Sequence, residues 1–356
     1  MESHYTSQSL LGKPQNSVLI TGHGTYGFGQ VPIQTPGKDQ LLIKVEAATL
    51  NPSDILFMRG LYNIKLNYPY TPGWEGAGTV VLAGDGSSDA TKAMVGKRVA
   101  FMKSFEFGAY KEGGSYAEYC ITNAMQVFPV SQDMSFDEVA SFVVNPMTAV
   151  CMVERLKQLK SKCVIITAAA SQIGRMLIKL CQHNKITTIC TIRRAEQIPL
   201  LKSIGVEHIV NTSEPNYKQT MLSLCGKLKP SSCLECISGD VTGEMLEYLG
   251  FKSTLILYGL LSDQPAGAIK TIPFIGKAQT IESFLLFTFL QMLKPDQVAQ
   301  IVKTTESMIK KELKTEVQAQ YGYHQIGEAV QYYLKNQTAG KILLKPSLTK
   351  GEQPKL

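Results

Sequence analysis

The middle of the chain, from about Phe136 to Phe289, alternates between short apolar runs and helical stretches. Each apolar run is uninterrupted, which is typical of a strand buried on both faces, and a helical stretch separates it from the next run. The expected strands are Cys163–Ala169, Thr188–Ile192, His208–Val210, Leu234–Ile237 and Thr254–Tyr258, and the expected helices are Ile173–His183, Ala195–Ser203, Tyr217–Leu228 and Val241–Leu249. This alternation predicts a doubly wound α/β domain, in which helices cover both faces of a parallel sheet.

The residues on either side of this block predict a second, β-rich domain. From about Val18 to Gln126 the sequence is rich in glycine and proline between short β-type runs, as in a small barrel. These runs are Leu41–Val45, Gly78–Leu82, Arg98–Met102 and Ser115–Ile121. The end of the chain, from about Lys294, adds one or two helices and a β run at Gly340–Lys345 that is expected to return to the first domain. The expected domains are therefore 1–140 with 292–356, and 141–291.

Composition excludes several classes of protein. With 44% hydrophobic and 18% charged residues, the 356-residue chain is too apolar to be disordered. The net charge is 36 − 29 = +7 without a long run of one sign, so we expect no nucleic-acid partner, although a phosphorylated small molecule would suit it. Of the eight cysteines only Cys233 and Cys236 are spaced C-x-x-C, and no second pair completes a zinc site.

The sequence contains no pattern typical of a membrane or secreted protein. Residues Met1–Ser17 have neither an apolar signal core nor an arginine-rich amphipathic pattern. The longest apolar run, Phe284–Leu290, falls well short of the roughly 20 residues that a spanning helix needs. We therefore expect no membrane span and a cytoplasmic location, with a mitochondrial one left open.

A loop of small residues follows the first expected strand of the α/β block. It reads Ala-Ala-Ala-Ser-Gln-Ile-Gly over residues 168–174. A dinucleotide pyrophosphate binds to free N–H groups at the start of a helix, and small residues let the backbone approach it. Only the last glycine of G-x-G-x-x-G is present, so a tight turn without a ligand is the alternative. The expected cofactor contacts in this loop are Ala170, Ser171, Gln172, Ile173 and Gly174.

Two arginines, Arg193 and Arg194, follow the second expected strand. A carboxylate at this point would bind the ribose 2′-hydroxyl of NAD, whereas arginine forms bidentate, charge-assisted bonds with a 2′-phosphate. The pair therefore predicts NADPH rather than NADH as cofactor, unless both side chains are simply exposed at the end of a strand. Lys341, next to Gly340, is a further candidate for the cofactor's phosphate or ribose, with a solvated surface lysine as the alternative.

Six short motifs occur in order along the chain. They are A-x-x-N-P-x-D at Ala48–Asp54, P-G-x-E-G-x-G at Pro72–Gly78, G-x-x-A-E-Y within Gly113–Tyr119, N-P-x-T-A at Asn145–Ala149, A-A-x-x-x-x-G at Ala168–Gly174, and Gly340-Lys341 at a terminal strand. In this order they resemble the zinc-independent medium-chain dehydrogenases/reductases, in the branch of the quinone oxidoreductases and trans-2-enoyl reductases. The resemblance implies a GroES-like catalytic domain built from both ends of the chain, with an inserted Rossmann domain that binds NADP. It also implies a homodimer formed through the last strands of the nucleotide domains, here near Thr280–Leu286.

Two positions distinguish the chain from the zinc alcohol dehydrogenases that share this fold. Those enzymes carry a cysteine and a histidine where this sequence has Asn51 and Trp74, and neither of these is a zinc ligand. Glu75 is retained, but one carboxylate does not hold the ion, and Phe101–Ser115 lacks the family's four-cysteine lobe. We therefore expect no metal. The resemblance then implies reduction of an activated C=C bond, in which NADPH supplies hydride to a quinone, enone or enoyl thioester and a proton follows.

The resemblance also implies roles for individual residues. Tyr62 matches the candidate proton donor of the enoyl reductases in type and position, or else it is a wall of the substrate cleft. Asn51 is expected to donate to the cofactor ribose or the substrate carbonyl, with a turn residue before proline as the alternative. Asn145 and Thr148 are expected at the nicotinamide end of the cofactor, or else only in the first turn of a helix.

Tyr258 and Gly259 complete the expected cofactor contacts, because they follow the last expected strand at the carboxyl ends where such sheets bind ligands. The expected partner is a small conjugated carbonyl compound, and the sequence does not separate a quinone from an enoyl thioester. Two other interpretations stay open. One is a non-catalytic structural or regulatory subunit that keeps the reductase fold, suggested by the missing glycines and the bulky Gln172. The other is a protein that binds NADPH as a sensor.

Overall fold

The computed structural model describes residues 8–62, 64–103 and 113–350. The chain forms two compact units, one from Met1–Val144 with Thr305–Leu356 and the other from Asn145–Thr304. They are called unit 1 and unit 2 below, and each is described by itself. The domain limits expected from the sequence, at 140/141 and 291/292, stay a prediction, and the units of the structure change at 144/145 and 304/305.

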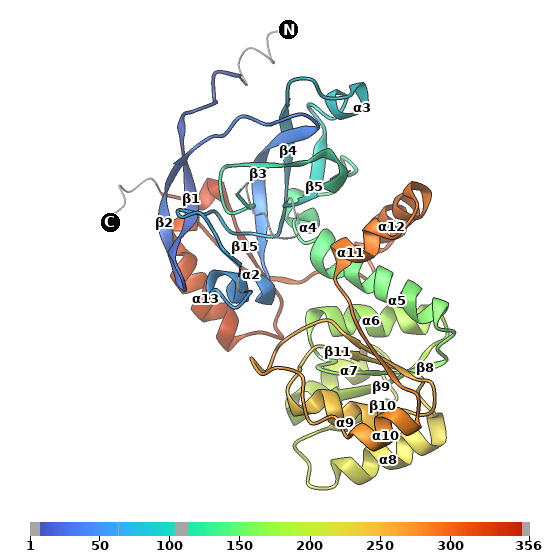
Figure 1. Cartoon of the computed structure of the whole chain (residues 1–356). Helices are drawn as coiled ribbons and strands as arrows, with labels where there is room; N and C mark the ends of the chain where they lie inside the picture. Colours follow the sequence, from blue (N-terminus) through green and yellow to red (C-terminus); the bar gives the residue numbers. More distant parts are fainter. Residues whose placement is uncertain (1–7, 63, 104–112, 351–356) are drawn as a thin grey trace. The chain divides into compact units, whose positions relative to one another are not determined.

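Unit 1 contains an antiparallel hairpin and a larger mixed sheet to which both ends of the chain contribute (Figure 1). The hairpin pairs β1 with β2, and the larger sheet has the order β14-β15-β3-β4-β5-β7, with β6 paired to β3. The strands are β1 Pro14–Gly22, β2 Thr25–Pro32, β3 Gln40–Leu50, β4 Glu75–Ala83, β5 Arg98–Met102, β6 Tyr119–Asn123, β7 Val127–Pro129, β14 Val317–Tyr321 and β15 Lys341–Leu344. Strand β15, from the end of the chain, therefore lies between β14 and β3.

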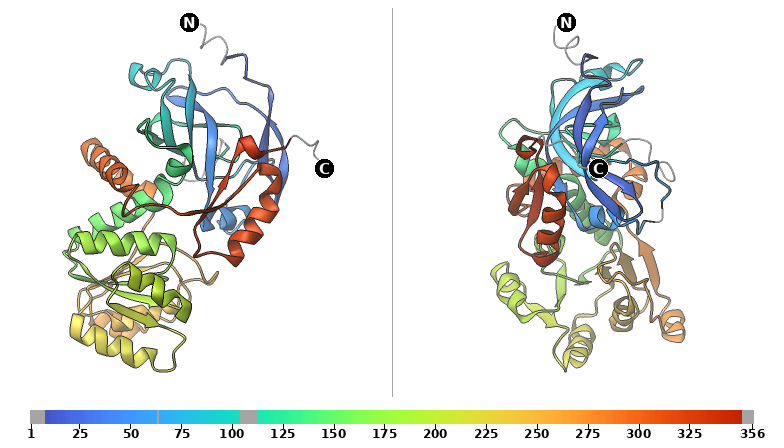
Figure 2. Two further views of the ribbon diagram at one scale, coloured as in Figure 1. Left: turned by 180° about the vertical axis from the view of Figure 1, so that it is seen from behind. Right: turned by 90° about the vertical axis from the view of Figure 1, so that its left-hand side faces the viewer.

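The core of unit 1 joins the two parts of the chain. Ile342 and Leu344 of β15 are completely buried in one cluster with Leu41 and Ile43 of β3. Helix α13 (Ile326–Lys335) adds its apolar face to the same cluster. Figure 2 shows the C-terminal segment, in red, beside the blue N-terminal strands from two sides. In the described residues of the unit, the remaining helices are α2 Pro52–Met58, α3 Asp89–Lys92 and α4 Phe136–Val139, with short 3₁₀ turns η1 Ala124–Gln126, η4 Tyr323–Gln325 and η5 Pro346–Leu348.

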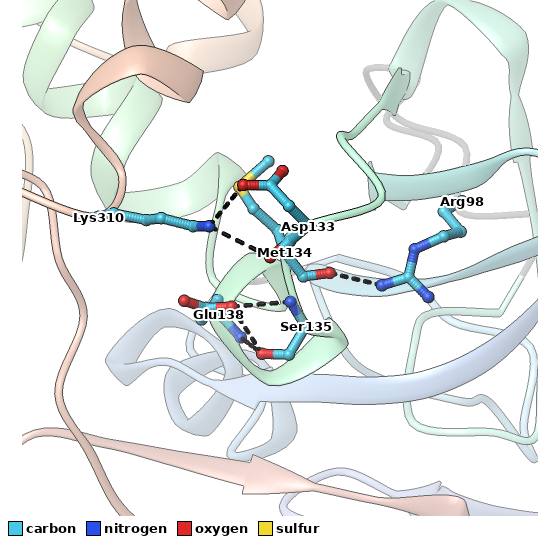
Figure 3. A network of polar contacts seen from close by, with 6 residues as sticks. All are labelled: Arg98, Asp133, Met134, Ser135, Glu138 and Lys310. Atoms are coloured by element: carbon cyan, nitrogen blue, oxygen red, sulfur yellow. Dashed lines mark hydrogen bonds and ion pairs between the residues drawn. The ribbon is translucent and has the colours of Figure 1, made fainter.

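Polar contacts around α4 also connect the two sequence segments that form unit 1 (Figure 3). Lys310 Nζ lies 2.8 Å from Asp133 Oδ2, and Arg98 Nη2 donates to Met134 O at 2.6 Å. A reciprocal capping box between Ser135 and its third following residue starts α4. Since the Lys310–Asp133 pair is exposed, it adds little to stability, and the capping box is what orders the helix start.

Unit 2 contains a six-stranded sheet in which every pairing is parallel, in the order β10-β9-β8-β11-β12-β13. The strands are β8 Cys163–Ile166, β9 Thr187–Ile192, β10 His208–Asn211, β11 Ser232–Glu235, β12 Thr254–Leu257 and β13 Thr280–Ser283. The helices are α5 Thr148–Gln158, α6 Gln172–His183, η3 Ala195–Gln197, α7 Ile198–Ser203, α8 Tyr217–Leu228, α9 Asp240–Tyr248, α10 Thr271–Gly276 and α11 Leu286–Gln291, and α12 Pro295–Met308 crosses the limit of the unit. The doubly wound sheet expected from the sequence is confirmed. The strand order reverses at β8, so ligands are expected at the carboxyl ends of β8 and β11.

Some element ends differ from the expectation for local reasons. Strand β8 ends at Ile166 rather than Ala169, because Ala168 has a φ of 46° that no strand adopts. The helix expected from Ala195 begins as a 3₁₀ turn, and α7 places Pro199 in its first turn, where no N–H is needed. The β1–β2 hairpin was not among the named runs, because β2 contains two glycines, which are rare in strands.

Candidate active site

Four polar side chains form a buried cluster in unit 1 where α2, β4 and β15 begin. Asn51 is the N-cap of α2 and Asp54 lies in its first turn, while Glu75 and Lys341 are the first residues of β4 and β15. Asn51, Asp54 and Glu75 are 0% exposed and Lys341 is 2% exposed. Buried charges need close partners, because removing an ion from water costs several kcal/mol.

The side-chain amide of Asn51 is oriented by two of these partners. Lys341 Nζ donates to Asn51 Oδ1, and Asn51 Nδ2 donates to Glu75 Oε1 at 3.0 Å. Since an ammonium only donates and a carboxylate only accepts, this arrangement determines which end of the amide is the oxygen. The structure thus brings together Asn51 and Lys341, which the sequence analysis selected separately. Asn51 has no exposed surface, and its expected bond to a ribose or a substrate carbonyl stays a prediction.

Lys341 is buried, so the alternative of a solvated surface lysine is wrong. Its backbone N–H donates to Glu316 O at 2.7 Å, and Gly340 has no Cβ because one there would lie 2.4 Å from the same oxygen. Burial lowers the pKa of Lys341 to about 8, while the nearby Glu75 and Asp54 raise it. Its role toward the phosphate or ribose of the cofactor stays a prediction.

The carboxylate of Glu75 has further partners on the segment that leaves unit 1. Its Oε2 accepts the backbone N–H of Val143 at 3.0 Å and of Val144 at 2.7 Å. These residues open η2 (Val143–Met147), a π-helix that continues directly into α5. Burial raises the pKa of Glu75, whereas Lys341 and the hydrogen bonds lower it. Both carboxylate oxygens are therefore used by the protein itself.

Asp54 links the start of α2 to the start of β4. Its Oδ2 accepts the N–H of Asn51 at 2.8 Å, and its Oδ1 accepts the N–H of Trp74 at 2.9 Å. Burial raises the pKa of Asp54 to about 7, because the loss of water outweighs these hydrogen bonds. The carboxyl group is therefore about half protonated near neutral pH.

Asp54 should make the fold less stable as the pH rises from about 4 to 7. Between its ordinary pKa of 3.8 and its folded pKa of about 7, the folded state binds a proton that the unfolded state does not, so stability is lost as this proton leaves. The pKa difference corresponds to about 4 kcal/mol at pH 7. Urea unfolding at pH 4, 5.5 and 7 should show this extra loss in the wild type and not in Asp54→Asn. Equal pH dependence in the two proteins would contradict the expectation.

Tyr62 follows α2 and packs against aromatic rings. Its ring centroid lies 6.0 Å from that of Phe57 and 5.7 Å from that of Trp74. The residue is 40% exposed, and it borders a small cavity with Met58, Leu66 and His23. Partial burial and, to a smaller extent, the nearby Asp54 together raise its pKa to about 12. The hydroxyl therefore keeps its proton at neutral pH and gives it up only to a stronger base.

A second buried lysine, Lys103, lies behind this aromatic group and was not selected from the sequence. It is 1% exposed, with Nζ 4.2 Å from the ring centre of Tyr70, 5.1 Å from that of Phe57 and 5.5 Å from that of Trp74. It also donates to the Tyr70 hydroxyl. No motif signals such a lysine, because its neighbours come from distant parts of the sequence.

The expected cofactor loop of unit 2 joins β8 to α6. Ser171 is the N-cap of α6, and its Oγ accepts the N–H of Gly174 at 3.1 Å. Gly174 has to lack a side chain, because a Cβ there would lie 2.5 Å from Ala169 O. Ala170 is buried and Ile173 is half-buried. The close approach of helix and strand is the role of the last glycine in a dinucleotide loop, so these residues fit a pyrophosphate at the start of α6.

Gln172, the bulkiest residue of this loop, is held within the first turn of α6. Its Oε1 accepts from Arg175 Nη2 at 2.6 Å, and the residue is 8% exposed. Arg175 also adds a positive charge at the helix start that the sequence analysis did not select. A basic residue four positions after the N-cap serine was the available signal.

Arg193 and Arg194 are exposed directly after β9. Ser213 Oγ donates to Arg193 O at 2.6 Å, and Gln197 Oε1 accepts the N–H of Arg194 at 3.3 Å. Since β9 pairs in parallel with β8, the two arginines and the small-residue loop leave neighbouring strands at the same edge of the sheet. The structure therefore brings these two predicted groups together.

Tyr258 and Gly259 follow β12 at the same edge. A Cβ on Gly259 would lie 2.8 Å from Cys236 O, so the backbone here packs directly against the end of β11. The Tyr258 hydroxyl is buried beside Cys236, without a hydrogen bond of normal length to the described residues. Burial raises the pKa of Cys236 to about 11, so this thiol stays protonated at neutral pH.

Glu235, also not selected from the sequence, shapes the end of β11. Its carboxylate is 0% exposed and accepts the N–H groups of Ile237 at 2.5 Å and of Ser238 at 3.1 Å. Thr242 Oγ1 donates to it at 2.9 Å. A carboxylate at the end of an apolar strand was the available signal.

Asn145 and Thr148 lie on the segment that enters unit 2. Asn145 is inside the π-helix η2 and 8% exposed, and Thr148 is the first residue of α5. Pro146 lies within η2, so α5 does not begin at the proline. Their expected place at the nicotinamide end of the cofactor stays a prediction.

Two searches of the structure bear on metals and membranes. Within residues 8–62, 64–103 and 113–350, no group of three or more His, Cys, Asp and Glu side chains is placed to hold a metal ion. In the same described part of the chain, every helix is too short or too polar to cross a membrane.

Two family profiles match the chain. The alcohol dehydrogenase GroES-like domain matches residues 37–132, in unit 1, and the zinc-binding dehydrogenase domain matches residues 173–307. Together they cover more than half of the 356 residues.

Individual relatives carry oxidoreductase names. The chain is 26% identical over 305 residues to the mitochondrial enoyl-[acyl-carrier-protein] reductase of Arabidopsis thaliana, covering 83% of this chain and 78% of the relative. It is 24% identical over 326 residues to a protein of Leishmania amazonensis provisionally named a quinone oxidoreductase, covering 88% and 91%. A crystal structure from Mesorhizobium loti, provisionally named an NADPH:quinone reductase, superposes with a TM-score of 0.85 at 27% identity over 94% of this chain and 98% of that one. The chain therefore belongs to the medium-chain dehydrogenase/reductase family, in its quinone oxidoreductase and enoyl reductase branch.

Proposed function

We propose that this chain is an NADPH-dependent, zinc-free reductase of conjugated carbonyl compounds. The observation that carries the proposal is the shared edge of the sheet in unit 2. There the small-residue loop before α6 and the pair Arg193 and Arg194 leave adjacent strands. A pyrophosphate at the helix start and a 2′-phosphate at the arginines are the two charged groups that distinguish NADPH.

We assign the binding of the cofactor and the transfer of the proton to separate residues of the chain. Bound NADPH supplies the hydride. Ser171 caps α6 and keeps its first turn in place for the pyrophosphate, while Gly174 lets the helix approach the strand. Tyr62, partly exposed and protonated at neutral pH, is proposed to give the proton that the substrate needs at its α-carbon. Asn51 is proposed to act from within the buried cluster, and Asn145, Thr148, Tyr258 and Lys341 to line the cofactor.

The buried cluster of unit 1 does not fit a zinc ion. The groups that could bind a metal are one amide and two carboxylates, whose carboxylate oxygens already accept N–H groups, and the Lys341 ammonium lies against the amide. A second cation beside this ammonium would be repelled, and no thiolate or imidazole is among the four side chains of the cluster. The proposal therefore derives no step from a metal.

Replacing both arginines by alanine should remove the preference for NADPH. Each lost charge-assisted bond is worth roughly 1.5–3 kcal/mol, so Arg193→Ala/Arg194→Ala should bind NADPH at least about 100-fold more weakly while NADH binding stays the same. Titration of the purified protein followed by nicotinamide fluorescence measures both constants. Lys202→Ala/Lys218→Ala removes two exposed positive charges from the same unit and is the matched control.

The outcomes separate three candidate functions: a reductase, a non-catalytic subunit and a sensor of NADPH. An unchanged NADPH preference in the arginine variant would contradict the cofactor assignment. Wild-type protein that binds neither nucleotide would instead favour a non-catalytic subunit, and a sensor would bind NADPH without turning over any quinone, enone or enoyl thioester. The substrate panel is therefore the second measurement.

The pairing of two copies near Thr280–Leu286 is also a proposal. Strand β13 is the last strand of the sheet, and Leu285 beside it is 44% exposed. Pairing of β13 with β13 of a second copy would provide hydrogen-bond partners for the backbone groups at this edge of the sheet. Sedimentation equilibrium would measure whether two copies associate. The cytoplasmic location stays a prediction. A mitochondrial location also stays open, because the name of one relative places that relative in mitochondria.

A further inference from the structure

The carboxylate of Glu75 lies at the point where the chain leaves unit 1. The unit ends at Val144, and Glu75 Oε2 accepts the N–H groups of Val143 and Val144 at 3.0 and 2.7 Å. A helix start has backbone N–H groups without an intrahelical partner, and Glu75 supplies a partner for the first two of η2. The acceptor comes from β4, far away in the sequence, rather than from a local cap.

The other groups of the cluster hold this carboxylate in place. Asn51 Nδ2 donates to its second oxygen at 3.0 Å, and Lys341 Nζ donates to the oxygen of the same amide. The chain of contacts therefore runs from β15 through α2 to β4 and ends on the backbone of η2. Two further titratable groups act on the Glu75 carboxylate: Asp54 from α2, and Tyr116 from the segment before β6.

The segment held in this way carries residues of the proposed cofactor site. Asn145 comes directly after Val144 inside η2, and Thr148 follows when η2 becomes α5. π-Helical turns are rare and occur often at functional sites, where they reposition side chains. A shift of the first turn of η2 would therefore displace both residues.

We propose that Glu75 is a positioning residue that, held by Asn51 and Lys341, fixes the start of η2 and thereby the placement of Asn145 and Thr148 toward NADPH. The inference rests on the proposed function, because it takes the cofactor role of these two residues from there. In this proposal the buried acid acts through the backbone of η2, because its oxygens accept from Asn51, Val143 and Val144.

Two double variants test the proposal without leaving either member of the Glu75–Lys341 pair as an unpaired buried charge. Glu75→Gln/Lys341→Met retains a side-chain oxygen that accepts from η2, whereas Glu75→Met/Lys341→Met has the same length and no acceptor. In amide hydrogen exchange resolved by residue, Val143 and Val144 should exchange at least about tenfold faster in the Met/Met variant than in the Gln/Met variant. The dissociation constant for NADPH should rise about tenfold between the same two proteins. Lys345→Met, which breaks the 2.6 Å pair with Asp137 elsewhere in unit 1, should change neither quantity.

Equal NADPH binding by the two double variants, when the wild type binds NADPH, would overturn the positioning role alone. Wild-type protein that binds no NADPH would overturn the proposed function, and the cofactor half of this inference with it. If the Met/Met variant does not fold, hydrogen exchange in the wild type still tests whether Glu75 protects the start of η2. The amides of Val143 and Val144 should then exchange at least about tenfold more slowly than those of Lys218 and Gln219. The latter two lie in the first turn of α8, where Asn216 provides no side-chain cap. Equal exchange rates there would overturn it.

Discussion

Tyr62→Phe is expected to lower kcat for the reduction of an enone or enoyl thioester by about 10²–10⁴-fold, the usual contribution of a positioned general acid. The phenyl ring retains the packing against Phe57 and Trp74 and loses only the hydroxyl. The proposal gives the Tyr62 hydroxyl no role in binding the cofactor, so the dissociation constant for NADPH should be unchanged. Steady-state kinetics with a fixed panel of substrates, together with the fluorescence titration, measure both quantities.

The matched control for this variant is Tyr332→Phe. Tyr332 is 39% exposed, close to the 40% of Tyr62, and it lies on α13 of the same unit. It should retain full activity. A Tyr62→Phe protein that binds NADPH and turns over at the wild-type rate would leave Tyr62 as a wall of the cleft, and another donor would have to be sought.

Lys341→Met is expected to lower the free energy of unfolding by about 3–5 kcal/mol at pH 7, because it leaves the completely buried Glu75 without a positive partner. Methionine fills nearly the same space as the lysine stem, so the loss reflects charge and hydrogen bonding more than packing. Urea unfolding followed by circular dichroism measures the change.

The second substitution Glu75→Gln should restore most of that stability. With both charges of the pair removed, Glu75 is no longer an unpaired ion, and replacing a buried ion pair by neutral groups is often close to neutral in free energy. The free energies of the wild type, the two single variants and the double variant form a double-mutant cycle, and a coupling energy near zero would show that the two residues do not act as a pair.

The sequence was enough to predict the parts of this site that depend on neighbours along the chain. The loop before α6 and the arginines after β9 are local motifs, so their placement at one edge of the sheet followed from the strand order that doubly wound sheets adopt. The role of Gly174 was predictable for the same reason, since the close approach of a helix to the preceding strand is a local matter.

The buried cluster of unit 1 was not predictable in this way. Lys341 and Glu75 come from opposite ends of the chain, and a lysine next to a glycine near the end of a sequence usually lies on the surface. Its burial depends on β15 lying between β14 and β3, a pairing that no local pattern specifies. The raised pKa of Asp54 likewise depends on what covers it rather than on its motif.

The position of β15 has a consequence for synthesis on the ribosome. Strand β15, which lies between β14 and β3 in the sheet of unit 1, is made only after residues 145–304 of unit 2. Unit 2 contains all the strands of its own sheet, so it is free to fold while the nascent first part still exposes the edge of β3. Until Lys341 arrives, Glu75 also lacks its cation. A chaperone that holds nascent chains should therefore stay bound to the part of unit 1 that precedes unit 2 until β15 has emerged from the ribosome.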